Sequence, residues 1–90
     1  MGTTLLKIKL MPSSPDVDLE EIKAKAKEVL EKGQGKNCNF EEELIAFGLK
    51  AIIVSFDIDE FHDLELIERG LEKIENVNSA RVIDMRRAFG

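Results

Sequence analysis

The chain opens with a strict alternation of apolar and polar positions. Between Thr4 and Met11, the side chains of Leu6, Ile8 and Leu10 fall on one side of an extended segment, and lysines occupy the other side. This period of two predicts a half-buried β-strand. Pro12 and Pro15 follow, and they predict a short irregular connection because proline removes a backbone donor and fixes φ.

Two later segments have helical spacing. The first covers Asp16 to Lys32, and its apolar stripe consists of Leu19, Ile22, Ala26, Val29 and Leu30. Asp18 with Glu21 predicts a capping box at its start, and Gly33 predicts a C′ stop at its end.

The second helix is predicted from about Asp63 to Glu75, after an acidic connection that contains His62. Its apolar stripe is interrupted by Gly70. Glycine inside a helix costs about 1 kcal/mol relative to alanine, so Gly70 indicates a close approach of this helix to the sheet.

Three more segments have strand character. Lys36 to Ala46 alternates, with Cys38, Phe40 and Glu42 on one face, although the pattern blurs near its end. Leu49 to Ile58 is apolar on both faces, which is typical of a central strand. Ser79 to Arg86 is the last strand, and alternation places three of its residues on one face: Ala80, Val82 and Asp84.

The resulting order is β-α-β-β-α-β in one domain spanning residues 1–90. Two amphipathic helices and four strands bury their apolar sides most economically as an α+β, two-layer ferredoxin-like plait, in which both helices cover one face of an antiparallel four-stranded sheet. The other face of the sheet is left open or is covered by a partner.

Composition narrows the possible functions. Eighteen acids against thirteen Lys and Arg make a net charge of −5, which argues against a domain whose main work is to bind nucleic acid. One cysteine and one histidine exclude a disulfide framework and a Cys/His zinc site within one chain. No stretch is long and apolar enough for a membrane helix, and no secretory signal is visible, so we expect a cytoplasmic domain with no membrane contact.

The charge is also uneven along the chain. Residues 57–78 hold eight acids and two basic residues, a local −6, whereas residues 79–90 hold three arginines and Asp84, a local +2. Arg86 and Arg87 in this last segment suit carboxylates or phosphates, but they equally suit an edge strand protected against aggregation.

Chemistry-bearing residues are few. Phe47-Gly48 separates two strands, and the spacing favours a turn or bulge with a buried ring over an exposed anchor at a loop tip. His62 has acidic neighbours but no nucleophile motif, and it is interpreted as a surface histidine. No phosphate-binding loop, metal motif or cofactor motif is present, so the residues indicate a binding module and not an enzyme.

Three segments in order resemble one family. Met11-Pro12-Ser13-Ser14-Pro15-Asp16-Val17-Asp18, then Glu43-Leu44-Ile45-Ala46-Phe47-Gly48-Leu49-Lys50-Ala51, then Val82-Ile83-Asp84-Met85-Arg86-Arg87 are similar to archaeal translation elongation factor 1-beta. The resemblance covers essentially the whole chain. It implies a ferredoxin-like guanine nucleotide exchange factor that promotes GDP release and GTP rebinding on elongation factor 1-alpha, without covalent chemistry or a cofactor.

The resemblance also implies which residues meet the GTPase. Phe47 and Gly48 belong to the docking surface, and Lys50 is a secondary contact. Eukaryotic relatives carry a lysine near the C-terminus that reaches toward the Mg²⁺ site. This tail has no lysine, so either Arg86 or Arg87 replaces it or the metal is displaced differently. We expect a monomer, although the pattern does not decide the oligomeric state.

Three other classes share this order of elements. A small regulatory or ligand-binding plait that dimerises through its sheet is the main alternative. An RNA-binding plait is disfavoured by the acidic charge and by the absence of an aromatic-rich central strand. An acylphosphatase-like enzyme would need an anion-binding loop with arginine after the first strand, where this chain has Pro12-Ser13-Ser14-Pro15.

Overall fold

The predicted order of elements is confirmed in a computed structural model that describes residues 2–59 and 64–89. The elements are β1 (Gly2–Pro12), α1 (Leu19–Lys32), β2 (Lys36–Ala46), β3 (Leu49–Asp59), α2 (Leu64–Glu72) and β4 (Val77–Phe89). Most of the predicted acidic connection, including His62, lies outside the described residues.

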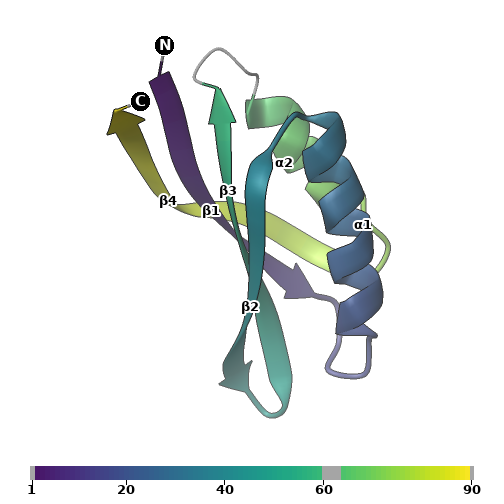
Figure 1. Ribbon diagram of the computed structural model, residues 1–90. Coiled ribbons are helices and arrows are strands. Elements are labelled where there is room, and N and C mark those ends of the chain that lie inside the picture. The colour runs from purple at the N-terminus through teal and green to yellow at the C-terminus, as the bar shows by residue number, and fades with distance from the viewer. Residues whose placement is uncertain (1, 60–63, 90) are drawn as a thin grey trace.

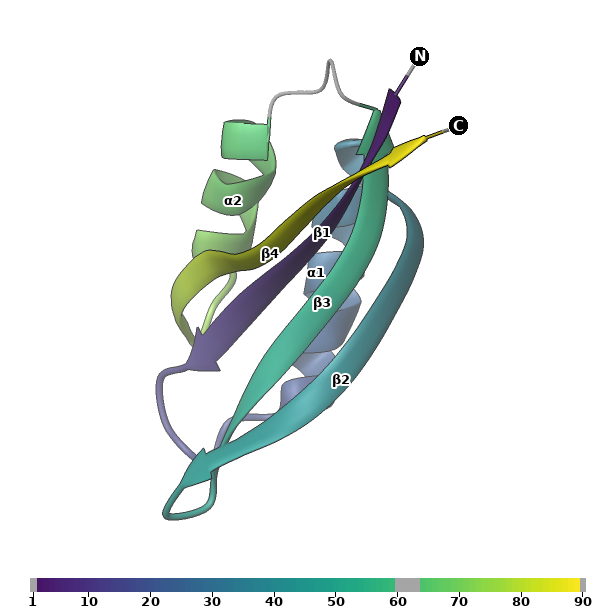
Figure 2. The same cartoon turned by 90° about the vertical axis from the view of Figure 1, so that its left-hand side faces the viewer.

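All four strands form one antiparallel sheet in the order β2-β3-β1-β4. Both helices pack on the same face of this sheet, and the other face carries no layer of the described chain (Figure 2). The molecule is therefore the two-layer ferredoxin-like plait predicted above. The two central strands are β1 and β3, as the apolar character of Leu49 to Ile58 indicates.

The core lies between the sheet and the helices. Every residue that the alternation of β1 predicted to face inward is buried. The helix stripes are buried at most positions, although Leu19 and Val29 of α1 are only partly buried. The buried cluster includes Leu6, Ile8, Leu10, Ile22, Ala26, Leu30, Val54, Phe56, Ile67 and Leu71. Cys38 packs at its margin, where burial, and then the negative charge of Glu31, raise the pKa of the thiol. Cys38 is therefore a half-buried, free cysteine.

A β-bulge in β4 corrects one prediction. Lys7 pairs with Asp84, and the next residue, Ile8, pairs with Val82, so Ile83 has no partner on β1. The extra residue reverses the alternation beyond it. Val82 packs against the core, whereas Asp84 lies opposite Lys7 on the open face of the sheet. The prediction that Val82 and Asp84 share a face is therefore wrong.

Helix α1 starts as predicted at its cap but not with a full capping box. The Asp18 carboxylate accepts a hydrogen bond from the backbone N–H of Glu20 at 3.0 Å. Glu21 does not complete the reciprocal arrangement, because its carboxylate lies 3.2 Å from the ammonium of Lys25 instead.

The end of α1 also differs from the prediction. Gly33 is the C-cap residue with φ −85°, and Gln34, with φ +63°, holds the left-handed C′ position. The N–H of Gly35 donates to Leu30 at 2.7 Å and that of Gln34 to Glu31 at 3.1 Å, which is the Schellman pattern. Gly33 is small for a packing reason, since a Cβ there would lie 2.7 Å from Ile67 Cγ1.

Gly70 does mark a close approach, but to a different element. A Cβ at Gly70 would lie 2.8 Å from Val29 Cγ1 on α1, so the approach is to the neighbouring helix and not to the sheet. Helix α2 itself runs from Leu64 to Glu72, so it ends three residues before the predicted Glu75, and the predicted start at Asp63 lies outside the described residues.

Candidate functional site: two exposed ends of the sheet

The β2–β3 connection is a two-residue turn made by Phe47 and Gly48. Ala46 pairs with Leu49, and the two residues between them have φ +52° and +81°. Positive φ at both positions is the hallmark of the type I′ hairpin turn, which usually carries Asn-Gly or another small pair. Nothing lies within 4 Å of a Cβ built on Gly48, so glycine is required there by its backbone and not by packing.

Phe47 is fully exposed, with 101% of its surface accessible. The prediction that favoured a buried ring is therefore wrong, because the hairpin carries this residue past the end of the helices, where nothing covers it (Figure 1). A bulky side chain in the left-handed region is strained by about 1–2 kcal/mol. Phe47 therefore costs free energy twice, through its left-handed backbone and through the exposure of its apolar ring to water. These costs point to a functional reason for its presence.

Two apolar neighbours add to Phe47. Leu44 is 67% and Ile45 is 38% exposed, and a register shift between Leu44 and Ala46 marks a bulge at this point. We call Leu44, Ile45, Phe47 and Gly48 the hairpin tip. Sequence reasoning missed Leu44 and Ile45 as candidate site residues, although the apolar run that blurred the strand pattern was their signal.

Lys50, the predicted secondary contact, is held at the base of the tip. Its ammonium lies 3.8 Å from Glu42 Oε1 on β2, and the other carboxylate oxygen of Glu42 accepts a hydrogen bond from Lys23 on α1 at 2.7 Å. The hydrogen bond from Lys23, followed by the lysine's charge, lowers the pKa of Glu42. The same hydrogen bond raises the pKa of Lys23.

The two predicted arginines lie on opposite faces of the sheet. Arg86 pairs with Leu5 and Arg87 with Thr4, so they alternate along β4. Both are exposed. Arg86 Nε lies 3.2 Å from Asp84 Oδ2, and both residues line the open face. Without the bulge, the two arginines would each point to the other side.

A shallow hollow of about 280 Å³ surrounds Arg86 on the open face. Its polar lining includes Lys7, Asp57 and Asp84, and Asn37 donates a hydrogen bond to Asp57 at 2.6 Å. The two acids and two cations of this lining balance one another. The hollow therefore offers no strong charge of one sign to a ligand.

The hairpin tip and the arginines lie at opposite ends of the molecule, so the structure does not bring the five predicted residues into one site. The termini meet at one end, and the hairpin extends at the other (Figure 1). Asp57, which lies level with Arg86 across β1, is eight residues from Leu49, a span of about 26 Å along β3. The longest dimension of the molecule is 43 Å. A partner must reach along the sheet to touch both ends.

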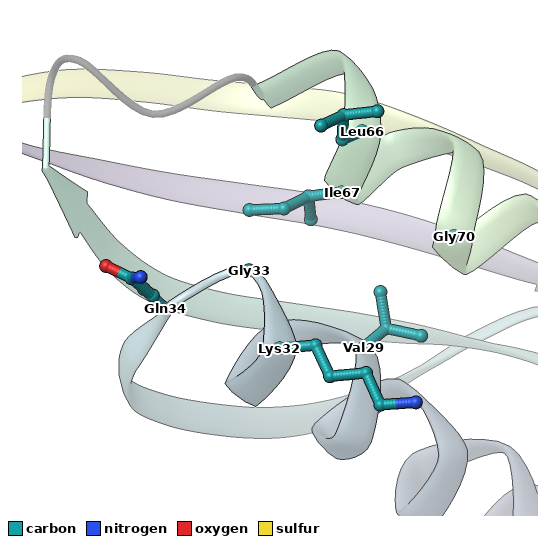
Figure 3. A pocket seen from close by; sticks show the side chains of 7 residues that line it. All are labelled: Val29, Lys32, Gly33, Gln34, Leu66, Ile67 and Gly70. Carbon is teal, nitrogen blue, oxygen red and sulfur yellow. The ribbon is translucent and has the colours of Figure 1, made fainter.

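A separate groove of about 420 Å³ lies between the C-terminal end of α1 and α2 (Figure 3). It is lined mainly by apolar or small residues, including Val29, Leu66, Ile67 and Gly70, and Lys32 stands at its rim. This groove contains neither of the two ends described above.

Within residues 2–59 and 64–89, no three Asp, Glu, His or Cys side chains gather as metal ligands. In the same part of the chain, neither helix combines the length and the apolarity needed to cross a membrane. What distinguishes the surface is an exposed apolar tip and a basic strand end, which are features for contact with another protein.

This small protein-binding plait is matched by a known domain. Residues 5–88 match the EF-1 guanine nucleotide exchange domain, and the chain belongs to that family. Three proteins named elongation factor 1-beta are similar over nearly their whole length. The relative from Methanosarcina barkeri is 42% identical and covers 97% of this chain and 99% of its own. Those from Methanocaldococcus jannaschii and Methanococcus maripaludis are 41% and 37% identical, each covering 94% of this chain and 97% of its own.

Membership confirms the predicted family and the predicted function, guanine nucleotide exchange in translation elongation. The main alternative, a regulatory plait that dimerises through its sheet, has no comparable support. Family membership does not itself select residues, so the roles of the hairpin tip and the arginines rest on the geometry.

Proposed function

We propose that this chain promotes GDP release from elongation factor 1-alpha by contacting the GTPase at both ends of the sheet. The hairpin tip enters an apolar recess of the GTPase, and the arginine end acts electrostatically near the nucleotide. No covalent step and no cofactor are needed. We also propose that the factor is cytoplasmic, acts as a monomer and binds neither membrane nor nucleic acid directly.

The exposed, left-handed Phe47 is the observation that carries this proposal. A fully buried phenylalanine contributes about 1.5–3 kcal/mol, and central aromatic anchors dominate many protein interfaces. Leu44 adds a second exposed apolar side chain beside it. The type I′ turn, closed by two strands, presents these side chains with little freedom to lose on binding.

The two-ended arrangement accounts for exchange without any chemistry in this chain. An exchange factor works by binding the GTPase more tightly when the nucleotide site is distorted than when it is intact. A hundredfold acceleration of GDP release needs about 2.7 kcal/mol of this differential affinity. Docking at the tip supplies affinity for the GTPase in either state. A cation near the nucleotide makes binding tighter when the nucleotide site is distorted than when it is intact.

In this proposal Lys50 is a structural residue of the hairpin in addition to a secondary contact with the GTPase. Its ammonium faces Glu42 at the base of the hairpin tip. It therefore stabilises the hairpin as well as lying within reach of a partner at this end. Arg86 and Arg87 stay alternatives for the cation near the nucleotide, since neighbouring residues of β4 point to opposite faces of the sheet.

Release of a fluorescent GDP analogue from elongation factor 1-alpha tests the proposal. Phe47→Ala should weaken half-saturation by about thirtyfold, which corresponds to about 2 kcal/mol of docking energy. Leu66→Ala, which removes another exposed apolar side chain, on α2, serves as the matched control and should leave exchange unchanged. Normal exchange by a folded Phe47→Ala variant would contradict the proposal.

A further inference from the structure

The part of β2 that leads to the hairpin tip has no buried side chain. Every residue from position 41 to position 48 is exposed, whereas Phe40, just before them, packs against the core. The β2 side of the tip is therefore not held by the core, whereas β3 is buried as far as Ala51. The direction of the tip depends on the ladder to β3 and on side-chain contacts near its base.

Glu42 provides a contact of this kind on the helix side. Its Oε2 accepts a 2.7 Å hydrogen bond from Lys23 of α1, and its Oε1 lies 3.8 Å from Lys50 of β3. One carboxylate thus bridges the helix layer and the hairpin, with one oxygen for each cation. Glu20 adds a second acid to Lys23 at 3.5 Å.

This bridge is partly screened from water. The side chains of Lys23 and Glu42 are 18% and 34% exposed, which is less than those of the Glu65–Arg69 ion pair on α2. The hydrogen bond also raises the pKa of Lys23 and lowers that of Glu42, so both groups are charged over a wide pH range. On the open face of the sheet, Lys9 lies 4.0 Å from Glu43, the next residue of β2.

We propose that Glu42 is a positioning residue for nucleotide exchange, which holds the hairpin tip at its docking angle through Lys23. This inference rests on the proposed function of the tip. Phe47 lies five residues beyond Glu42, about 17 Å along an extended strand, so a swing of about 10° would displace the ring by about 3 Å. Loss of the bridge therefore affects docking far more than folding, to which a single, partly exposed ion pair contributes little.

The test compares Glu42→Gln with Lys23→Gln in the assay of GDP release. Each should raise the half-saturating concentration about three- to tenfold while the plateau rate stays unchanged, because the distorted nucleotide site is not touched. Lys23→Arg, which keeps the cation, should restore half-saturation. Glu21→Gln is the matched control, since Glu21 belongs to the same helix and pairs with Lys25.

A cycle with Phe47→Ala decides whether Glu42 acts through the tip. In the Phe47→Ala background, Glu42→Gln should cause little further loss, because the anchor that it positions is absent. A full, additive loss would overturn the inference, as would Glu42→Gln behaving like Glu21→Gln. If Phe47→Ala is itself normal, the proposed function of the tip fails together with this inference; if only Glu42→Gln is normal, the tip keeps its function and only the inference is overturned.

Discussion

Gly70 of α2 faces Val29 of α1 so closely that a Cβ on the glycine would lie 2.8 Å from Val29 Cγ1. The two helices therefore meet through a glycine and a β-branched side chain. A second contact has the same character with the helices exchanged: the glycine is Gly33 at the end of α1, and the branched side chain is Ile67 of α2. The pairing of small with branched residues sets the spacing of the helix layer.

We predict that Gly70→Ala destabilises the fold by about 1–2 kcal/mol, although alanine is the better helix former by about 1 kcal/mol, because overpacking outweighs propensity here. Urea unfolding measures the change. Val29→Ala in the same chain should recover part of the loss, so that the two substitutions are coupled. A Gly70→Ala variant more stable than the parent would show that the helices separate at no cost.

The strain at Phe47 predicts a trade of stability against activity. Phe47→Asn should raise the free energy of unfolding by about 1 kcal/mol, because asparagine tolerates the left-handed turn conformation, while exchange weakens as in Phe47→Ala. Phe47→Ala is the control, since alanine keeps the strain and should bring no such gain. Chemical denaturation and GDP release are measured on the same samples. The prediction is refuted if the free energy of unfolding and the exchange activity of Phe47→Asn both rise or both fall.

The alternation of side chains along β4 predicts that Arg86 and Arg87 are not equivalent. A partner that approaches this end from one face of the sheet meets either Arg86 or Arg87. One single alanine variant should therefore reproduce the loss of the double variant within about a factor of two, and the loss should shrink as salt rises. Arg69→Ala on α2 removes the same charge elsewhere and controls for net charge. Equal, additive losses from both arginines would contradict the prediction.

The bridge at Glu42 predicts a pH window for hairpin stability. A lowered carboxyl pKa contributes stability that is present above the ordinary value of 4.5 and is lost as pH falls through the lowered pKa of the folded state. The raised pKa of Lys23 acts at the other limit, where stability is lost as pH rises above 10.5. The difference in unfolding free energy between the parent and Glu42→Gln should thus be constant near neutrality and vanish in acid. A difference that persists at pH 2 would exclude the ion pair as its source.

Much of the fold was predictable because it depends on local periodicity. The alternation around Ile8 and the helical spacing around Ala26 each specify an inward face, and those residues are buried in the structure. The family resemblance was equally readable, since it rests on contiguous motifs. For the candidate site, the sequence identified residues but not their surroundings. Phe47 was named as a candidate, but its ring was predicted to be buried.

The order of elements, the faces that enter the core and the family follow from the amino-acid sequence, because each of these is encoded in residues near one another in the chain. Contacts between residues that are distant in the chain depend instead on the folded molecule. Folding brought Lys23 to Glu42, 19 residues away, and Gly70 to Val29. It also inserted the bulge at Ile83, which depends on pairing with β1, and so determined which of Arg86 and Arg87 lies on the open face of the sheet.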